Sequence, residues 1–507
     1  MSTATTAPEQ EVTRSPWASL IPLCLAVTLY KLDTTIVNVA LPSIQQDLHT
    51  SQEATVWTVS SYILALTMSI PLAGALGDRL GRRRVFVFGM VLFGLFSGAC
   101  ALAPSDLWLI ILRFGQGLAA GVLIPLSMAI VGASFRGPDL TTAYGLWSGT
   151  SSIGFVIGPL IGGVLVKQVG WQSVFWVNVP LSPLLVPLTY WLVDESSDPN
   201  PRPLDLVGMV LSTVGLALVA VALIGTTRTA WGAPGTLIPL LGGVGVLAAF
   251  TAWEFHTDHP LLPMGFFKAR GFALGGVIGA IVYAFPAALL FLTLYFQGIL
   301  GDNPERASLL FIPLALALTV VAVLAGPITK KVGAINSTVV GMGLMAAGAF
   351  GLAGLTTQEE LTRLIISEVL LGVGIMLAVP ATSAVMMESI PREQASVGSA
   401  VMQAFRQVGA LLFVGVLSAV AAAKAKSAFT LPGGEEAAHK LLPDVIGAQM
   451  NQVKAAAGGA AADAAASAWI QGLRAAMLLV AAMAALGVLL CLVTAVRRSR
   501  AQQPVKA

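Results

Sequence analysis

The chain has 507 residues, of which 56% are hydrophobic and only 10% are charged, with a formal net charge of +3 and a mean hydropathy of +0.83. A soluble domain carries about 25% charged residues, so this composition excludes a soluble globular protein and indicates an integral membrane protein. We expect no nucleic-acid partner.

Long apolar stretches recur along the chain and predict fourteen membrane-spanning helices. A hydrocarbon core about 30 Å thick needs about 20 apolar residues per helix, whereas the sequence lacks the alternating segments of a transmembrane barrel. The apolar stretch after the polar residues 1–16 is too long for a signal peptide, so we expect it to remain as the first span. The expected spans are 17–41, 54–76, 85–103, 107–132, 142–166, 174–193, 205–225, 235–254, 272–299, 305–326, 334–355, 364–387, 397–423 and 471–495.

The basic residues set the expected orientation. Short loops rich in Lys and Arg stay on the cytoplasmic side of a membrane, and segment 77–84, between the second and third spans, carries four arginines. With both termini in the cytoplasm, most basic residues of the short loops also lie there. We therefore expect a multi-pass protein of the cell membrane with both termini cytoplasmic.

Two stretches of the first half recur in the second half. "LAGALGDRLGRRRVFVFGM" at 72–90 aligns with "LAGPITKKVGAINSTVVGM" at 324–342, and "RFGQGLAAGVLIP" at 113–125 aligns with "EVLLGVGIMLAVP" at 368–380. Duplicated halves of this kind enclose a substrate site near the middle of the membrane. We expect an all-α membrane protein of two six-helix bundles with two additional helices between them.

This division predicts five parts along the chain. They are a cytoplasmic tail at 1–16, a six-helix bundle at 17–193, a linker with two inserted helices at 194–271, a second six-helix bundle at 272–495 that includes a long external loop at 424–470, and a cytoplasmic tail at 496–507. The external loop is Ala-rich, which is compatible with a helical lid or with disorder. We favour a lid and assign it no function.

Four ionisable residues within the spans are candidates for proton coupling or substrate binding: Asp33, Arg113, Glu368 and Arg406. Such a residue costs at least about 2.5 kcal/mol at the centre of a span, so it usually faces a cavity or a partner. A desolvated carboxylate such as Asp33 can exchange protons near neutral pH. We favour this role over a structural pair with Lys31, because residues two apart on a helix do not face each other.

The other three residues leave alternatives open. Arg113 could snorkel to the membrane surface, although we favour a functional role. Glu368 occupies the position of the repeat that aligns with Arg113. A functional role and a structural role are equally compatible with this residue. Arg406 either contacts substrate or pairs with Glu368 or Glu388.

The segment "GDRLGRRR" at 77–84 is a candidate gate. Gly77 and Gly81 allow close backbone approach, and Asp78 can cap the next helix or meet an arginine such as Arg79 or Arg82. A tight basic loop that only fixes orientation is the alternative.

The segment "GTSSIGFVIGPLIGGVL" at 149–165 is a candidate hinge. Its glycines permit close helix packing, and a proline in mid-span removes a backbone hydrogen bond and kinks a helix. Ordinary packing explains the glycines, while the proline favours a hinge. The residues are Gly154, Gly158, Pro159, Gly162 and Gly163.

No cofactor or metal is expected. The three cysteines lie in apolar stretches without metal or redox spacing. His256 and His259 supply two ligands where a zinc site needs three or four. The sequence has no GxxxxGK[ST] motif, so ATP coupling has no support.

These segments together resemble the fourteen-span drug:proton antiporters of the major facilitator superfamily, the branch typified by EmrB and QacA. The similar segments are "LDTTIVNVALP" (32–42), "GDRLGRRR", "RFGQGLAAG" (113–121), "GFVIGPLIGG" (154–163) and "WQSVFWVNVP" (171–180). The resemblance implies that Asp33 responds to protons or cations and that Arg113 tunes proton coupling. It also implies that Asp78 and Arg82 belong to a cytoplasmic gate and that Gly154, Gly158 and Pro159 form the hinge.

The resemblance predicts a proton-coupled exporter of amphipathic drugs, cationic ones included, or of an endogenous metabolite, by alternating access. The protein would be a monomer and would use the proton gradient as its energy source. A dedicated exporter of one natural product and an uptake symporter of the same fold are alternatives, and a membrane enzyme or sensor is a third. Lys31 stands where this branch more often has an uncharged residue, and the ninth span lacks an acidic residue. Both features favour a substrate that is not strictly cationic.

Overall fold

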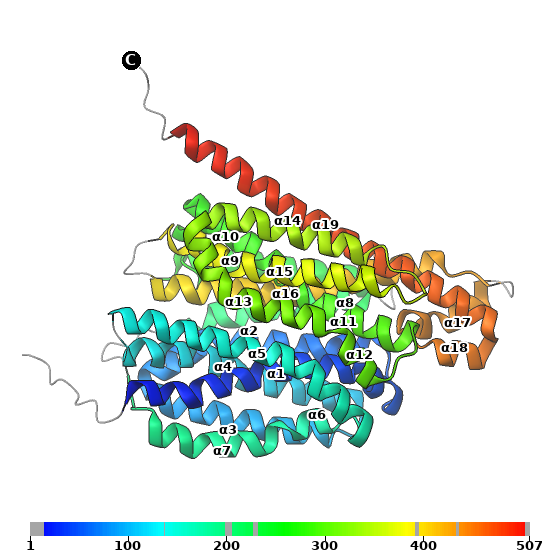
Figure 1. Cartoon of the computed structure of the whole chain (residues 1–507), viewed down its shortest axis with the longest axis horizontal. Helices are drawn as coiled ribbons and strands as arrows, with labels where there is room; N and C mark the ends of the chain where they lie inside the picture. Colours follow the sequence, from blue (N-terminus) through cyan, green and yellow to red (C-terminus); the bar gives the residue numbers. More distant parts are fainter. Residues whose placement is uncertain are drawn as a thin grey trace, which may run out of the picture.

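The computed structural model describes residues 15–135, 137–197, 205–226, 232–390, 395–431 and 435–501, which form helices and short connections with no strand among them. The helices run roughly parallel to one another, and their ends define two faces of the molecule (Figure 1). We call the end where the first helix begins and the last helix finishes the terminal end, and the opposite end the distal end.

The first bundle is formed by seven helices, of which the two shortest follow each other directly. The tightest packing pairs the first helix with the fifth, the second with the fourth, and the third with the fourth. The helices are α1 (Pro16–Asp47), α2 (Gln52–Leu80), α3 (Arg82–Ala101), α4 (Asp106–Ser134), α5 (Gly137–Val169), α6 (Ser173–Trp176) and α7 (Asn178–Leu192).

The second bundle is built from more broken helices, several of which join end to end. Its main contacts are α14 with α15, α13 with α15, and α19 with α14 and α16. The elements are η1 (Met264–Lys268), α10 (Arg270–Val282), α11 (Phe285–Leu294), η2 (Tyr295–Ile299), α12 (Pro304–Leu310), α13 (Ile312–Val332), α14 (Ala334–Leu352), α15 (Leu361–Met387), α16 (Ala395–Ala428) and α19 (Gly459–Ala501).

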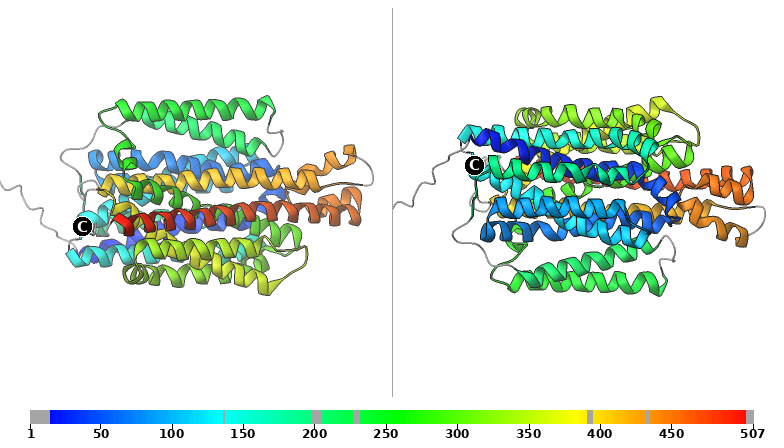
Figure 2. Two further views of the ribbon diagram at one scale, coloured as in Figure 1. Left: turned by 90° about the horizontal axis from the view of Figure 1, so that it is seen from above. Right: turned by 90° about the horizontal axis from the view of Figure 1, so that it is seen from below.

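A pair of helices between the bundles, α8 (Leu206–Gly225) and α9 (Pro234–His256), lies along one edge of the molecule (Figure 2, green). Helix α8 packs on α2 and α16, so the pair contacts both bundles. At its terminal end, Asp205 Oδ1 accepts hydrogen bonds from the Gly208 amide and Trp253 Nε1, each 2.8 Å long, and Glu254 Oε2 accepts one from the Leu262 amide, also 2.8 Å.

The other oxygens of the same two carboxyl groups meet above a glycine. A Cβ atom added to Gly208 would lie 2.3 Å from Asp205 Oδ2 and 2.7 Å from Glu254 Oε1. Both oxygens are buried and accept no hydrogen bond from the described residues. The two oxygens are thus at most 2.3 + 2.7 = 5.0 Å apart. Two buried carboxylates this close repel each other strongly, and a proton on one of them would remove the repulsion.

Twelve described helices or helix pairs are long and apolar enough to cross a membrane, and a bent α2 would make thirteen. Of α5, only Ile157–Val169 is recognised as an apolar helix among the described residues. The protein is therefore a helical, multi-pass membrane protein, and the expected count of fourteen spans exceeds the twelve found here.

The aligned repeat has a counterpart in the backbone. Gly81 joins α2 to α3 with φ of 101°, and Gly333 joins α13 to α14 with φ of 93°. These two glycines occupy equivalent positions of the repeat, and side-chain-bearing residues rarely adopt positive φ. The two halves therefore turn between equivalent helices in the same way.

Contacts between the bundles join their distal ends. Lys167 at the end of α5 forms an ion pair with Glu305 of α12. Gln297 Nε2 donates a 2.9 Å hydrogen bond to the carbonyl of Val39. A Cβ atom on Gly163 of α5 would lie 2.0 Å from Ser308 Oγ of α12, so the two helices touch at this glycine.

The segment expected as a long external loop, 424–470, is largely helical where it is described. Helix α16 continues to Ala428, and α17 (Glu435–Ile446) and α18 (Met450–Ala457) follow and form a cap at the distal end (Figure 1). A Cβ atom on Gly447 would lie 2.5 Å from Gln45 of α1, and one on Gly298 of η2 would lie 2.3 Å from the Ala448 carbonyl. The turn between α17 and α18 therefore touches both bundles.

Candidate functional site

Asp33 lies in the middle of α1 and is completely buried in the first bundle. Its Oδ2 is 2.8 Å from Arg113 Nη1 of α4, which forms an ion pair with it. Its Oδ1 accepts hydrogen bonds from Gln116 Nε2 (3.0 Å) and Asn178 Nδ2 (2.8 Å). The carboxylate thus has three donors from two other helices, which is the condition under which a buried charge is tolerated.

The guanidinium of Arg113 makes further contacts of its own. It donates to Gln116 Oε1 (2.7 Å) and, through Nε, to the carbonyl of Thr58 (3.3 Å). Its Cζ lies 4.0 Å from the centroid of the Tyr62 ring, close enough for a cation–π contact. Asn178 also donates to Ser97 Oγ of α3 (3.0 Å), so helices α1, α2, α3, α4 and α7 all reach this network.

This geometry excludes two of the alternatives for these residues. Arg113 is only 2% exposed and points at Asp33, so it does not snorkel to the membrane surface. Asp33 pairs with Arg113 and not with Lys31. Its hydrogen bonds are satisfied inside the bundle, so it does not line the cavity described below.

Glu368 lies in α15 of the second bundle and is also completely buried. Neither of its carboxyl oxygens has a hydrogen-bond partner among the described residues. A charged carboxylate is costly to bury without a partner. The residue that aligns with Arg113 is therefore not paired as Arg113 is.

Arg406 of α16 points toward α15 without meeting either glutamate proposed for it. It donates to Gln403 Oε1 (2.9 Å), to the Val379 carbonyl (2.9 Å) and to Ser383 Oγ (2.5 Å). Its Cζ also lies 5.5 Å from the centroid of the Tyr283 ring. Of the two alternatives left open for Arg406, a pair with Glu368 or Glu388 is not found among the described residues, because these neutral oxygens occupy the guanidinium.

A cavity of about 70 Å³ lies between the bundles and receives side chains from both. From the first bundle α1 and α2 line it, and from the second α10, α11, α13, α15 and α16. Gln407 Nε2 donates to the Tyr30 hydroxyl across this boundary (3.4 Å). The lining residues are Tyr30, Lys31, Thr34, Tyr62, Ile63, Leu66, Val282, Tyr283, Phe285, Pro286, Leu318, Ile375, Met376, Val379, Gln407 and Ala410.

Tyr62 connects the cavity with the ion pair. One face of its ring is packed on the Arg113 guanidinium, and the residue also lines the cavity. The Asp33–Arg113 pair is thus separated from the cavity by one aromatic side chain. A change in the charge of the pair would reach the cavity wall through Tyr62.

Three glycines of the candidate hinge segment lie against α1. Cβ atoms added to Gly154, Gly158 and Gly162 would lie 2.6 Å from the Thr28 carbonyl, 2.0 Å from Thr35 Oγ1 and 2.8 Å from Ile36 Cγ1. Helices α1 and α5 therefore pack backbone to backbone beside Lys31 and Asp33. Pro159 lies inside α5, and Gly163 faces α12.

The candidate gate segment is fixed within the first bundle. Arg82 is paired with Asp78 (Nη2–Oδ1 2.8 Å), and Arg79 is exposed at the end of α2. The carboxylate of Glu195, in the segment after α7, accepts hydrogen bonds from the amides of Arg83 (3.0 Å) and Arg84 (3.2 Å) and so caps α3.

Space for that carboxylate exists because residue 81 has no side chain. A Cβ atom on Gly81 would lie 2.7 Å from the Glu195 carboxyl group, whereas one on Gly77 would meet Leu126 of α4 at 2.3 Å. The two glycines of this segment therefore have packing roles in the first bundle.

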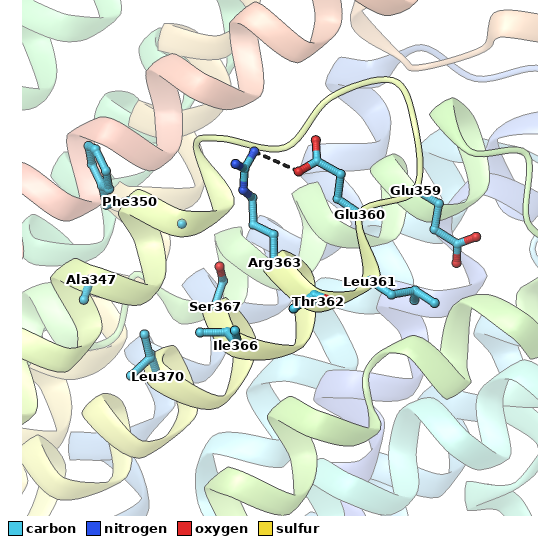
Figure 3. Close-up of a pocket in the computed structure, with 11 residues that line it drawn as sticks. Ala347, Phe350, Glu359, Glu360, Leu361, Thr362, Arg363, Ile366, Ser367 and Leu370 are labelled. Carbon is cyan, nitrogen blue, oxygen red and sulfur yellow. Dashed lines mark ion pairs between the residues drawn. The ribbon is translucent and has the colours of Figure 1, made fainter.

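A second depression, of about 740 Å³, lies between α14 and α15 at their distal ends (Figure 3). Arg363 and Glu360 form an ion pair at its edge (2.9 Å), and Phe350, Leu361 and Ile366 line it with exposed side chains. Exposed apolar walls on the outside of membrane-spanning helices suit lipid chains. The cavity between the bundles is therefore the candidate functional site.

The sequence interpretation gives no role to several residues that complete the site. Gln116, Asn178 and Tyr62 bind the ion pair, and Glu195 caps α3. Gln116 is three residues after Arg113, so helical spacing puts both on one face of α4. Asn178 has a weaker signal, a single amide in an apolar segment, and Glu195 has none.

Two helical bundles that enclose a cavity beside a buried ion pair define the class of secondary membrane transporters. The Major Facilitator Superfamily model matches residues 23–414, and the chain belongs to this superfamily. The protein is accordingly a transporter and not an enzyme.

Curated relatives support export as the direction. The chain is 33% identical over 417 residues to the tetracenomycin C resistance and export protein of Streptomyces glaucescens, covering 82% of this chain and 77% of the relative. It is 32% identical over 412 residues to the multidrug resistance protein Stp of Mycobacterium tuberculosis (81% and 76%). It is 33% identical over 417 residues to the puromycin resistance protein of Streptomyces alboniger (80% and 81%). The expected class, a drug efflux transporter, is confirmed.

Solved structures agree in fold. An inward-facing bacterial homologue of the human lysosomal transporter Spinster superposes with a TM-score of 0.67 at 18% identity, over 94% of this chain and 96% of the other. A peptide transporter of the POT family, PepTSo, gives a TM-score of 0.62 at 14% identity over 96% and 99%. At these identities the comparison supports the fold alone.

Proposed function

We propose that this protein exports amphipathic compounds in exchange for protons, with the Asp33–Arg113 pair as the proton-linked site and the cavity between the bundles as the substrate site. The observation that carries the proposal is the position of the pair. It is buried and hydrogen-bonded, and Tyr62 both packs on it and lines the cavity.

The pair can couple the two events through charge. A proton on Asp33 removes the negative charge that holds Arg113, and among the described residues the guanidinium then keeps the neutral acceptors Gln116 and Thr58. Because Tyr62 packs on that guanidinium, a shift of Arg113 changes the cavity wall. Substrate binding and proton binding would then favour different arrangements of the first bundle, which is the thermodynamic requirement for exchange.

Alternating access requires the bundles to part at one end at a time. The contacts at the distal end favour an arrangement in which the distal side is closed. With the terminal end in the cytoplasm, as the basic loops indicate, this is the state that receives substrate from inside. Glycines 154, 158 and 162 would let α5 move along α1 without side-chain obstruction.

We further propose fourteen spans, as in the EmrB and QacA branch, with both termini in the cytoplasm. The count adds the bent α2 and the 33-residue α5 to the twelve apolar helices. In this arrangement α8 and α9 are the two inserted spans between the bundles. The protein would work as a monomer, because one chain supplies both walls of the cavity, and would need no cofactor.

A dedicated exporter of one natural product is the second candidate. Two of the compared relatives are named for a single antibiotic, tetracenomycin C or puromycin, and a third is named as a multidrug protein. Uptake symport has less support, since these names describe resistance and export.

Proteoliposomes with an acidic interior test the proposal. Purified protein is reconstituted, the lumenal pH is followed with a trapped dye, and a panel of cationic, neutral and anionic amphipathic compounds is added. Transported compounds are expected to raise the lumenal pH as protons leave. If only one structural class of compound raises the lumenal pH, a dedicated exporter of one natural product is favoured. If none of the panel acts, proton-coupled export is contradicted.

A further inference from the structure

The depression between α14 and α15 combines an apolar wall with a charged edge (Figure 3). Phe350 and Ile366 are exposed on the wall, and Ala347 and Gly351 add no long side chain to it. Both helices are long and apolar enough to span a membrane. Exposed apolar patches with a polar rim mark interaction sites, and the volume of about 740 Å³ lies in the range of ligand sites, about 300–1,000 Å³.

The positive charge of the edge comes from Arg363, near the start of α15. Its side chain is 47% exposed, its Nη1 lies 2.9 Å from Glu360 Oε2, and the same atom donates to the Gly354 carbonyl. Both contacts use Nη1, so Nε and Nη2 have no hydrogen-bond partner among the described residues. The N–H groups of Nε and Nη2 point in the same direction and can bind a phosphate in bidentate fashion.

Two carboxylates stand beside this arginine. Glu360 Oε1 accepts a 2.9 Å hydrogen bond from Thr356 Oγ1. Glu359 pairs with Arg306 of α12 (Oε2–Nη2 2.6 Å). Both carboxylates are partly exposed, and a carboxylate has about four acceptor positions, so each can accept a further donor. Among the described residues that line the depression, the charged ones are therefore Arg363 and these two glutamates.

These charges fit a lipid headgroup that has both a phosphate and a primary ammonium group. An anionic headgroup such as that of phosphatidylglycerol would meet two carboxylates beside one guanidinium, and the carboxylates repel it. The quaternary ammonium of phosphatidylcholine has no N–H to donate to a carboxylate. Phosphatidylethanolamine has a phosphate, an ammonium group with N–H donors, and acyl chains that suit the apolar wall.

We propose that this depression binds a phosphatidylethanolamine molecule, with the phosphate at Arg363, the ammonium at Glu360 and an acyl chain along Phe350. Glu359 is the second acceptor for the ammonium group. The site lies on the outside of the second bundle and is separate from the cavity between the bundles. Lipid binding here therefore does not depend on the proton-coupled export proposed above.

Photoreactive lipids test the site directly. The purified protein is reconstituted in vesicles of dioleoylphosphatidylcholine that contain a small share of one probe. The three probes are phosphatidylethanolamine, phosphatidylcholine and phosphatidylglycerol, each with the same diazirine-bearing acyl chain. After irradiation, mass spectrometry of the digested protein locates the label. The label on residues 347–370 is divided by the label on α13, where Val320 and Val323 are exposed to any lipid.

In the wild type, this ratio should be at least about 3-fold higher for the phosphatidylethanolamine probe than for either other probe, the size of an ion pair at a partly exposed site. Equal ratios for the three probes would show a groove open to any lipid, and a preference for phosphatidylglycerol would show an anion site. Label on α13 without label on 347–370 would show that protein, such as a second copy of this chain, covers the depression. Each of these three results would overturn the proposal.

Two variants separate the two parts of the headgroup. Glu360→Gln removes a carboxylate and should at least halve, by about 2-fold, the preference for phosphatidylethanolamine over phosphatidylcholine. Arg363→Gln removes the phosphate contact and should lower the ratio for all three probes about 3-fold. Lys454→Gln is the control, because Lys454 is exposed in α18 outside the depression, and it should leave all ratios unchanged.

The variants are informative only when they fold, which their melting temperatures check. Glu360 and Arg363 are both partly exposed, so neither substitution should unfold the protein. Wild-type ratios in both folded variants would contradict the assigned contacts. The comparison of the three probes on the wild type tests the proposal without any substitution.

Discussion

The buried pair makes a sharp prediction about Asp33→Asn. The substitution keeps the size of the side chain but removes the counter-charge of a guanidinium that is only 2% exposed, and it places an amide or carbonyl 2.8 Å from Arg113 Nη1. Removing one partner of a buried ion pair costs about 3–5 kcal/mol, because the other charge stays buried and uncompensated. Asp33→Asn alone is therefore expected to be clearly less stable than wild type.

A second substitution tests the origin of that loss. Arg113→Gln in the Asp33→Asn background removes the uncompensated charge and leaves neutral amides that can bind Gln116 and Asn178. The remaining cost is that of imperfect hydrogen bonds, about 1–2 kcal/mol. The double variant is expected to recover at least half of the lost stability.

The measurement is a double-mutant cycle on purified protein in one detergent. Unfolding is followed by tryptophan fluorescence, and the order of melting temperatures should be wild type, then the double variant, then the two single variants. If Asp33→Asn melts with wild type, or if the double variant loses the sum of the two single losses, the ion pair does not hold the first bundle together as described.

Three further substitutions test other contacts. In Gly158→Ala the new Cβ would lie 2.0 Å from Thr35 Oγ1, so the substitution should separate α1 from α5 and reduce transport at least about 10-fold. Gly343→Ala is the control, because its Cβ meets no atom within 4 Å, and it should transport as wild type does. Equal transport by both variants would refute the role of the close contact. Glu195→Ala removes the cap of two α3 amides and should lower the unfolding free energy by about 1–2 kcal/mol. Glu195→Asp should recover part of this loss. An unchanged melting temperature in Glu195→Ala would show that solvent replaces the cap. Glu254→Gln supplies a permanent donor to Asp205 Oδ2 and should melt at or above the wild-type temperature at pH 8. Glu254→Ala should melt at a lower temperature. A large drop in the melting temperature of Glu254→Gln would show that the two carboxyl groups do not share a proton.

The general architecture can be predicted from the sequence because each membrane-spanning helix leaves a local signal. Long apolar stretches give the spans, and the repeat of 72–90 in 324–342 finds its structural counterpart in the positive φ angles of Gly81 and Gly333. The helical structure of the cap is harder to predict from the sequence, because an Ala-rich segment has no apolar periodicity that distinguishes a packed helix from a disordered segment.

The site can be predicted only in part. Asp33 and Arg113 stand out because charges within spans are costly, but their pairing depends on the rotation of α1 relative to α4, which no local pattern specifies. For the same reason the sequence leaves two alternatives open for Arg406, and its pairing with Glu368 or Glu388 is not found among the described residues. Its partners are Ser383, Gln403 and a carbonyl of α15, and neutral groups of this kind carry no signal in the sequence.

Separating accumulation from exchange tests the central claim, that Asp33 links protons to transport. Proteoliposomes containing wild type or the Asp33→Asn/Arg113→Gln variant receive a compound of the panel that the wild type transports. Two rates are measured: uptake driven by an acidic interior, and exchange of labelled for unlabelled compound without a gradient. Wild type should show both, and the variant should keep exchange but lose gradient-driven uptake. Gradient-driven uptake by the variant at the wild-type level would contradict the assignment of Asp33.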